Sequence, residues 1–299
     1  MSATRPTMPE RDDCLLRPGN TNCGGCGMSV GLTMLDRALV EAGETCSLVI
    51  PACCGIVTAG AFPTSSYGVP TIATTFASSP AVASGVASIR DLNDEPGQVI
   101  CWAGDGGTYD IGLGTLSAAA ERNENIIYIC YDNEIYGNTG GQRSSATPLG
   151  ARTSTTPGGK TEGKKDIMSI MAAHRVPYAA TLSIAHPQDF AQKMATAFSL
   201  KGTRFLLLHS PCPTGWKSKP EDSIHLIRLA VASGLFPLYE VFDGSTYRIN
   251  IEPDGTDPAE YFSRQRRFRD EEIDLDETRR ACSDRMHRLE ALAEQYSAD

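Results

Sequence analysis

Short apolar runs alternate with longer segments of helical periodicity along the first two thirds of the chain. The runs are typical of strands buried on both faces of a parallel sheet. We predict five such strands, at residues 47–50, 98–102, 126–131, 179–184 and 204–209. Between them, the spacing of apolar residues predicts helices at 29–42, 80–92, 111–122, 166–174 and 187–200. This alternation predicts an α/β fold, with a mostly parallel sheet and helices on both faces.

Residues 137–165 interrupt the pattern, because Gly, Ser, Thr and Pro dominate them and five basic side chains accompany a single acid. A structureless loop of this length usually has a function. Farther on we predict a helix at 223–233, a hairpin across 238–251 and a charged helical tail at 258–299, with the character of a solvated or partner-facing helix. We therefore divide the chain into a main domain, 1–235, and a C-terminal extension, 236–299, made of the hairpin and the tail.

Composition narrows the range of functions. The 299 residues include 27 Lys and Arg against 36 Asp and Glu, a formal charge of -9, which disfavours nucleic-acid binding because phosphates need concentrated basic side chains. We find no apolar stretch long enough to cross a bilayer and no apolar signal-peptide core at the N-terminus. We expect a cytoplasmic protein with no nucleic-acid or membrane partner. Ten cysteines in such a protein indicate metal or redox chemistry rather than disulfides.

The cysteines fall into two groups. Four stand singly in apolar or helical contexts, where buried thiols act as small hydrophobes: Cys46, Cys101, Cys130 and Cys282. The informative group comprises a Cys-Gly-Gly-Cys pair, a doublet after a predicted strand, and a cysteine after another strand: Cys23, Cys26, Cys53, Cys54 and Cys212. A Cys-x2-Cys pair places two sulfurs on one turn, where one metal or cluster edge takes both. An iron–sulfur cluster, structural zinc, a redox pair and unliganded thiols all stay open at this point.

A second motif, Gly104-Asp105-Gly106-Gly107, directly follows the predicted strand 98–102, and Asn133 follows the next strand. Neighbouring parallel strands end at one edge of the sheet, so we expect Asp105 and Asn133 to hold one Mg²⁺ that bridges to a diphosphate. The glycines let the backbone approach the phosphates, and a helix beginning near Ile111 offers its N-terminal amides to the anion. A simple turn is the alternative explanation.

The stretch GDGGTYDIGLGTLSAAAERNENIIYICYDNEIYGNTGGQRSSATPLGARTSTTPGGK, together with HSPCPTGW and PLYEV, carries a resemblance to a known family. These segments closely resemble the β subunit of pyruvate:ferredoxin oxidoreductase, within the 2-oxoacid:ferredoxin oxidoreductase family, and the resemblance extends from Cys23 to about Phe268. It implies a thiamine diphosphate-binding fold with Mg²⁺ and a nearby [4Fe-4S] cluster within residues 1–235. It also implies oxidative decarboxylation of a 2-oxoacid, electron transfer to ferredoxin and acyl transfer to coenzyme A.

The resemblance assigns roles residue by residue. It places the cluster on four cysteines: Cys23, Cys26, Cys54 and Cys212. Cys53 then occupies a position where the family has Gly. The Mg²⁺ ligands implied in this way are Asp105, Asn133 and the backbone carbonyl of Ile135, and the catalytic residue beside the thiazolium and the substrate is Asn138.

Partners and substrate follow from the same resemblance. We see no pyrimidine-side domain and no two-cluster ferredoxin motif in the sequence, so we expect a heteromer with a pyrimidine-side α subunit and a ferredoxin-like subunit, acting with ferredoxin. The polar Asn138 favours a small 2-oxoacid, with pyruvate first and oxalate or a branched-chain 2-oxoacid as alternatives. A non-oxidative thiamine diphosphate-dependent decarboxylase and a zinc-stabilised assembly subunit are the rival interpretations.

Overall fold

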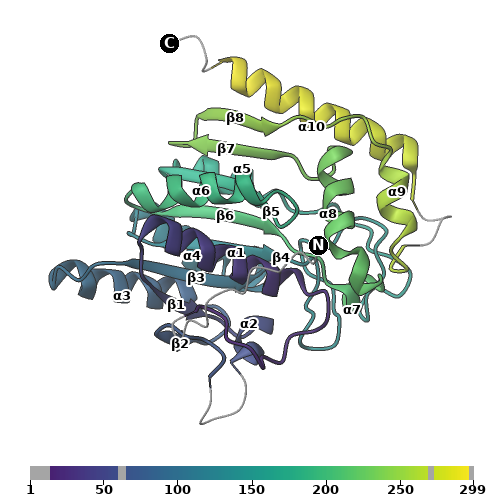
Figure 1. The fold of residues 1–299 in the computed structure, drawn as a ribbon. Helices are drawn as coiled ribbons and strands as arrows, with labels where there is room; N and C mark the ends of the chain where they lie inside the picture. Colours follow the sequence, from purple (N-terminus) through teal and green to yellow (C-terminus); the bar gives the residue numbers. More distant parts are fainter. Residues whose placement is uncertain (1–13, 60–64, 269–272, 296–299) are drawn as a thin grey trace, which may run out of the picture.

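A computed structural model describes residues 14–59, 65–268 and 273–295. Within these residues one sheet has the strand order β2-β1-β3-β4-β6-β5-β7-β8 (Figure 1). Its strands are β1 (Cys46–Ile50), β2 (Thr71–Ala73), β3 (Gln98–Gly104), β4 (Ile127–Asp132), β5 (Tyr178–Ser183), β6 (Arg204–His209), β7 (Leu238–Phe242) and β8 (Thr246–Ile251). The first six pair in parallel, whereas β7 is antiparallel to β5 and β8 to β7. The predicted mostly parallel sheet is confirmed.

Helices connect the strands. They are α1 (Gly27–Ala42), α2 (Cys54–Thr58), α3 (Ser79–Leu92), α4 (Leu113–Glu121), α5 (Ile167–Ala173), α6 (Pro187–Ser199), α7 (Pro213–Trp216), α8 (Ser223–Ala232), α9 (Pro258–Ser263) and α10 (Leu275–Gln295), with a π-helical turn η1 (Gly106–Asp110) and a 3₁₀ turn η2 (Pro220–Asp222). The predicted strands and helices are confirmed to within a few residues. The short elements α2, β2 and α7 lack the length that makes a periodic pattern visible in a sequence.

The sheet is covered on both faces, as consecutive residues of β3 show. The Trp102 ring lies 3.3 Å from the position that a Cβ at Gly31 of α1 would occupy. The thiol of Cys101 instead donates to the carbonyl of Ser79 at the start of α3, at 3.6 Å. Because neighbouring strand residues point to opposite faces, α1 and α3 lie on opposite sides of the sheet. Full burial of β4, β5 and β6 follows from this double cover.

The helix predicted from Ile111 is confirmed as α4, and a helical turn that was not predicted precedes it. A π-helical turn occupies Gly106–Asp110, in which the Ile111 N–H donates to the Gly106 carbonyl at 3.3 Å, and α4 follows it. A Cβ at Gly106 would lie 2.4 Å from the Tyr136 ring, so only glycine lets the helical turn start beneath that ring. Helical backbone therefore begins next to Asp105, ahead of the predicted helix. Wide π turns of this kind are frequent at functional sites.

The C-terminal elements pack onto the main sheet. The predicted hairpin is confirmed as β7 and β8, and β7 extends the sheet beside β5. Helix α10 lies alongside β8 at that edge and buries Cys282, Met286 and Leu289, so one of its faces is covered within the chain (Figure 1). The tail prediction at 269–272 and 296–299 lies outside the described residues, and the division at residue 235 stays a prediction. None of the described helices is both long and apolar enough to span a bilayer.

Candidate functional site

Three oxygen-bearing groups meet where β3 and β4 end. Asp105 follows β3 directly and Asn133 follows β4, and these two strands are parallel neighbours. The side-chain amide of Asn133 lies 2.8 Å from Asp105 Oδ1 and 2.7 Å from the carbonyl oxygen of Ile135. The structure therefore brings together the three residues to which the resemblance assigns Mg²⁺.

The three oxygen-bearing groups fit a cation of the size of Mg²⁺. With its nitrogen turned inward, the Asn133 amide donates hydrogen bonds to both neighbours. With its oxygen turned inward, three oxygens converge, an arrangement that needs a cation to hold it. Octahedral Mg²⁺ has ligands at about 2.0–2.1 Å, which places adjacent oxygens about 2.9 Å apart. The distances at Asn133 are close to that value, so a small change in the side chains is enough to ligate the cation.

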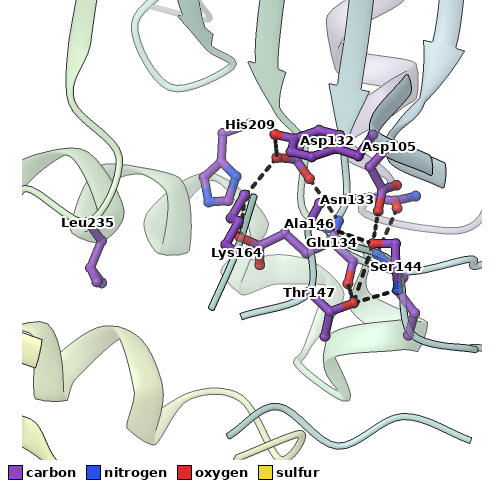
Figure 2. Close-up of polar contacts among 12 residues, drawn as sticks. Asp105, Asp132, Asn133, Glu134, Ser144, Ala146, Thr147, Lys164, His209 and Leu235 are labelled. Carbon is purple, nitrogen blue, oxygen red and sulfur yellow. Dashed lines mark hydrogen bonds and ion pairs between the residues drawn. The ribbon is translucent and has the colours of Figure 1, made fainter. Parts of the chain in front are cut away.

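Ser144, from the loop 137–165, completes the surroundings of Asp105. Its hydroxyl donates to Asp105 Oδ2, and its backbone N–H donates to Thr147 Oγ1 at 2.9 Å (Figure 2). The Thr147 hydroxyl in turn donates to the Glu134 carbonyl at 2.7 Å. Burial, and then the charge of Asp132, raise the pKa of Asp105 well above its usual value. Composition pointed to this loop, but no sequence pattern singled out Ser144.

A buried network of opposite charges lies behind these oxygens. The Lys164 ammonium lies 2.7 Å from Asp132 Oδ2 and 3.0 Å from Glu134 Oε1 (Figure 2). Arg267 Nη2 lies 2.6 Å from Glu134 Oε2. Burial by itself would raise the pKa of Glu134, but the charges of Lys164 and Arg267 lower it to about 2. The network was missed at the sequence level, because its cations come from a loop and from the C-terminal segment.

His209, at the end of β6, lies close to this network without carrying charge. Its ring stacks on Phe236 with centroids 4.6 Å apart, and its Nε2 lies 3.4 Å from the Tyr261 hydroxyl. Burial lowers the pKa of His209 to about 3. The side chain is therefore a neutral aromatic packing element.

At Gly137, two of the predicted cluster cysteines lie close to the oxygen set, the name used here for Asp105, Asn133 and the Ile135 carbonyl. A Cβ added there would lie 3.5 Å from Cys54 Sγ and 3.8 Å from Cys212 Sγ. It would also lie 3.8 Å from the Asn133 amide nitrogen. The thiols and the oxygen ligands thus surround one small volume that glycine leaves open.

The other two predicted cysteines lie near this pair. Burial raises the pKa of the Cys54 thiol to about 12, and the charges of Cys212, Cys53, Cys26 and Cys23 act in the same direction. The Gly27 N–H at the start of α1 donates to the Pro211 carbonyl at 3.0 Å, which holds the Cys-Gly-Gly-Cys turn against the segment of Cys212. Among the described residues, no three Cys, His, Asp or Glu side chains form a cage for a single metal ion.

The two cysteines of the doublet differ in their surroundings. The Cys53 thiol donates to the Pro51 carbonyl at 3.0 Å, and burial, its dominant influence, raises its pKa. Cys54 instead faces Gly137 and Cys212. Cys212 Sγ also accepts the Gly215 N–H at 3.4 Å, a contact of the kind that tunes thiolate ligands.

The remaining predicted site residues lie around the same opening. Gly104 ends β3, and Gly106 and Gly107 form the first residues of the helical turn. Asn138 is exposed in the turn that follows Gly137.

Comparison with known proteins gives these features a common context. Residues 53–209 match the family described as "Thiamine pyrophosphate enzyme, C-terminal TPP binding domain". A ketoisovalerate oxidoreductase subunit, VorB, of Pyrococcus horikoshii is 42% identical over 293 residues, which cover 93% of this chain and 93% of that protein. A pyruvate synthase subunit, PorB, of Methanothermobacter marburgensis is 44% identical over 269 residues, which cover 88% and 91%. The chain belongs to the 2-oxoacid:ferredoxin oxidoreductase family, as a β subunit.

The fold of this β subunit is also that of a solved relative. A chain of the 2-oxoglutarate:ferredoxin oxidoreductase from Magnetococcus marinus, solved with 2-oxoglutarate, coenzyme A and succinyl-CoA bound, superposes with a TM-score of 0.63. The match covers 86% of the β subunit and 92% of that chain at 21% identity, a level that establishes the fold alone. The predicted α/β thiamine diphosphate-binding fold is confirmed.

Proposed function

We propose that this β subunit holds thiamine diphosphate through Mg²⁺ and places a [4Fe-4S] cluster next to it, as the catalytic subunit for oxidative decarboxylation of a small 2-oxoacid. Asp105, Asn133 and the Ile135 carbonyl are the Mg²⁺ ligands. The cluster ligands are Cys23, Cys26, Cys54 and Cys212. The observation that carries the proposal is the meeting of the oxygen set and two of the thiols around Gly137.

The residues at the oxygen set bind and orient the diphosphate end. Asp105 contributes the negative charge that a divalent cation requires, and the Ser144 hydroxyl fixes the direction of that carboxylate. The helical turn Gly106–Asp110, which follows Asp105, would offer its first backbone amides to the diphosphate. Once bound, the cofactor supplies the electron sink for cleavage of the bond next to the 2-oxo group.

The cysteines provide the redox part of the site. Cys54 and Cys212 lie beside Gly137, so a cluster that they hold would lie next to the proposed Mg²⁺ ligand Asn133. Two thiols beside Gly137 and the Cys-Gly-Gly-Cys turn held against the Cys212 segment support a cluster of several irons. A cluster at this position supplies one-electron chemistry, which separates this function from that of a non-oxidative decarboxylase.

Pyruvate is the substrate that we favour. Asn138 lies exposed beside Gly137, where its amide is able to donate a hydrogen bond to an oxygen of a small substrate. Relatives of nearly equal similarity carry the names of pyruvate and ketoisovalerate enzymes, so a branched-chain 2-oxoacid is the second candidate. We propose coenzyme A as the acyl acceptor and ferredoxin as the electron acceptor, with an α subunit for the pyrimidine side of the cofactor and a ferredoxin-like subunit.

Anaerobic purification of the native complex tests this function. We expect stoichiometric iron and sulfide, thiamine diphosphate binding that depends on Mg²⁺, and coenzyme A-dependent reduction of ferredoxin by pyruvate. Assays with ketoisovalerate, oxalate and 2-oxoglutarate rank the substrates. Zinc in place of iron, or decarboxylation that needs no electron acceptor, would contradict the proposal. Faster turnover of ketoisovalerate than of pyruvate would change the proposed substrate and leave the rest of the proposal intact.

A further inference from the structure

The chain turns sharply between Asn133 and Ile135, the two proposed Mg²⁺ ligands that follow β4. Glu134, which separates Asn133 from Ile135, has a φ of 62°, in the left-handed region that few residues other than glycine adopt. This turn brings the Asn133 amide within 2.7 Å of the Ile135 carbonyl oxygen. Any loosening of the backbone at Glu134 would separate the two ligand oxygens.

Contacts from the loop 137–165 and from the C-terminal segment hold Glu134 in this conformation. Its carbonyl accepts the Thr147 hydroxyl at 2.7 Å, and one carboxylate oxygen faces Lys164 at 3.0 Å (Figure 2). Its other carboxylate oxygen faces Arg267 at 2.6 Å. Glu134 and Arg267 are both buried, so water does not replace either partner. An ion pair of this kind is costly to break on one side only, because the remaining charge stays buried.

Arg267 is itself rigidly held. Its guanidinium stacks over the Trp216 ring at 4.3 Å, and its Nε donates to Gln265 Oε1 at 2.9 Å. The indole N–H of Trp216 in turn donates to the Asn133 carbonyl at 2.8 Å. Arg267 therefore contacts the ligand turn by two routes, through the side chain of Glu134 and through Trp216 to the backbone of Asn133.

We propose that Arg267 is a positioning residue for the Mg²⁺ and diphosphate site, acting through Glu134 on Asn133 and Ile135. The inference rests on the proposed function, in which these two residues ligate the cation. It assigns Arg267, which lies between α9 and α10, a role in cofactor binding through its contacts with Glu134 and Trp216. Loss of such outer partners typically lowers metal affinity by about 10- to 100-fold.

The test measures the Mg²⁺ concentration at which thiamine diphosphate half-saturates the complete apo-complex. We expect R267M to raise it by about 10- to 100-fold. The isosteric variant E134Q should raise it similarly, R267K should restore part of the affinity, and the double variant R267M/E134Q should be no worse than R267M. R279M is the matched control and should leave the value unchanged, because the ion pairs of Arg279 with Asp257 and Asp276 are exposed.

Iron–sulfur absorption is recorded on the same samples. The proposal requires that this absorption stays at the wild-type level while the Mg²⁺ requirement rises. An unchanged Mg²⁺ requirement in E134Q would overturn the proposal. If R267M does not assemble into the complex, the result for E134Q tests the proposal by itself. Joint loss of cluster and Mg²⁺ binding in E134Q would indicate a general structural role and would also overturn it. Absence of Mg²⁺-dependent binding in the wild type would instead contradict the proposed function.

Discussion

Replacing Asp105 by Asn separates cofactor binding from folding. Asp105 is 1% exposed and carries the only carboxylate among the three proposed ligand oxygens. Asn keeps the shape of the side chain and still accepts the Ser144 hydroxyl, but it removes the negative charge. Loss of an outer partner of a metal costs about 10- to 100-fold in affinity, so loss of the charged ligand should cost about 100-fold or more, about 2.7 kcal/mol.

The same substitution should stabilise the cofactor-free protein. In the absence of a cation, the buried carboxylate of Asp105 lies near the charge of Asp132. Neutralising a buried charge of this kind often stabilises a protein, here on the order of 1 kcal/mol. Binding and stability should therefore change in opposite directions, which partial unfolding of the variant is unable to produce.

Calorimetric titration of the apo-complex with thiamine diphosphate and Mg²⁺ measures the affinity, and thermal unfolding without cofactor measures the stability. D91N is the control, because Asp91 is exposed at the end of α3, and neither quantity should change. An affinity within a factor of about three of the wild type would refute the assignment of Asp105 as a ligand. Reduced stability of the apo form would refute the electrostatic argument.

Three further predictions concern other parts of the site. Cys54→Ala should abolish the iron–sulfur absorption, whereas Cys53→Ala should retain it; the reverse result would exchange the two assignments. Gly106→Ala places a Cβ 2.4 Å from the Tyr136 ring and should weaken cofactor binding measurably in the same titration, and unchanged affinity would contradict the packing argument. Burial lowers the pKa of His209 from 6.5 to about 3, so stability should fall as the pH drops below 6.5, by about 2 kcal/mol at about pH 5. Denaturant unfolding of His209→Phe should lack this loss, and an equal pH dependence in both proteins would show that His209 is not its source.

The sheet and the meeting of Asp105 with Asn133 were predictable, because both depend on the local pattern of apolar and polar residues. Strands buried on both faces must be apolar throughout, so β3, β4 and β6 were evident as short apolar runs. Parallel strands end at one edge, so Asp105 and Asn133 could be expected to meet there. The π-helical turn ahead of α4 was not predicted, because the approach of the Tyr136 ring to Gly106 is a contact between distant parts of the chain.

By itself, the sequence determined the α/β class, the family resemblance and the residue types available for cation and cluster binding. Only the tertiary structure decided which loop and tail residues complete the site. Ser144 reaches Asp105 from 39 positions away, and Arg267 reaches Glu134 from 133 positions away. Periodicity describes neighbours along one element, whereas these contacts depend on how the loop 137–165 and the C-terminal segment pack against the ends of the strands. Burial then gives these charges their effect, because a lysine or arginine in water would hold Glu134 only weakly.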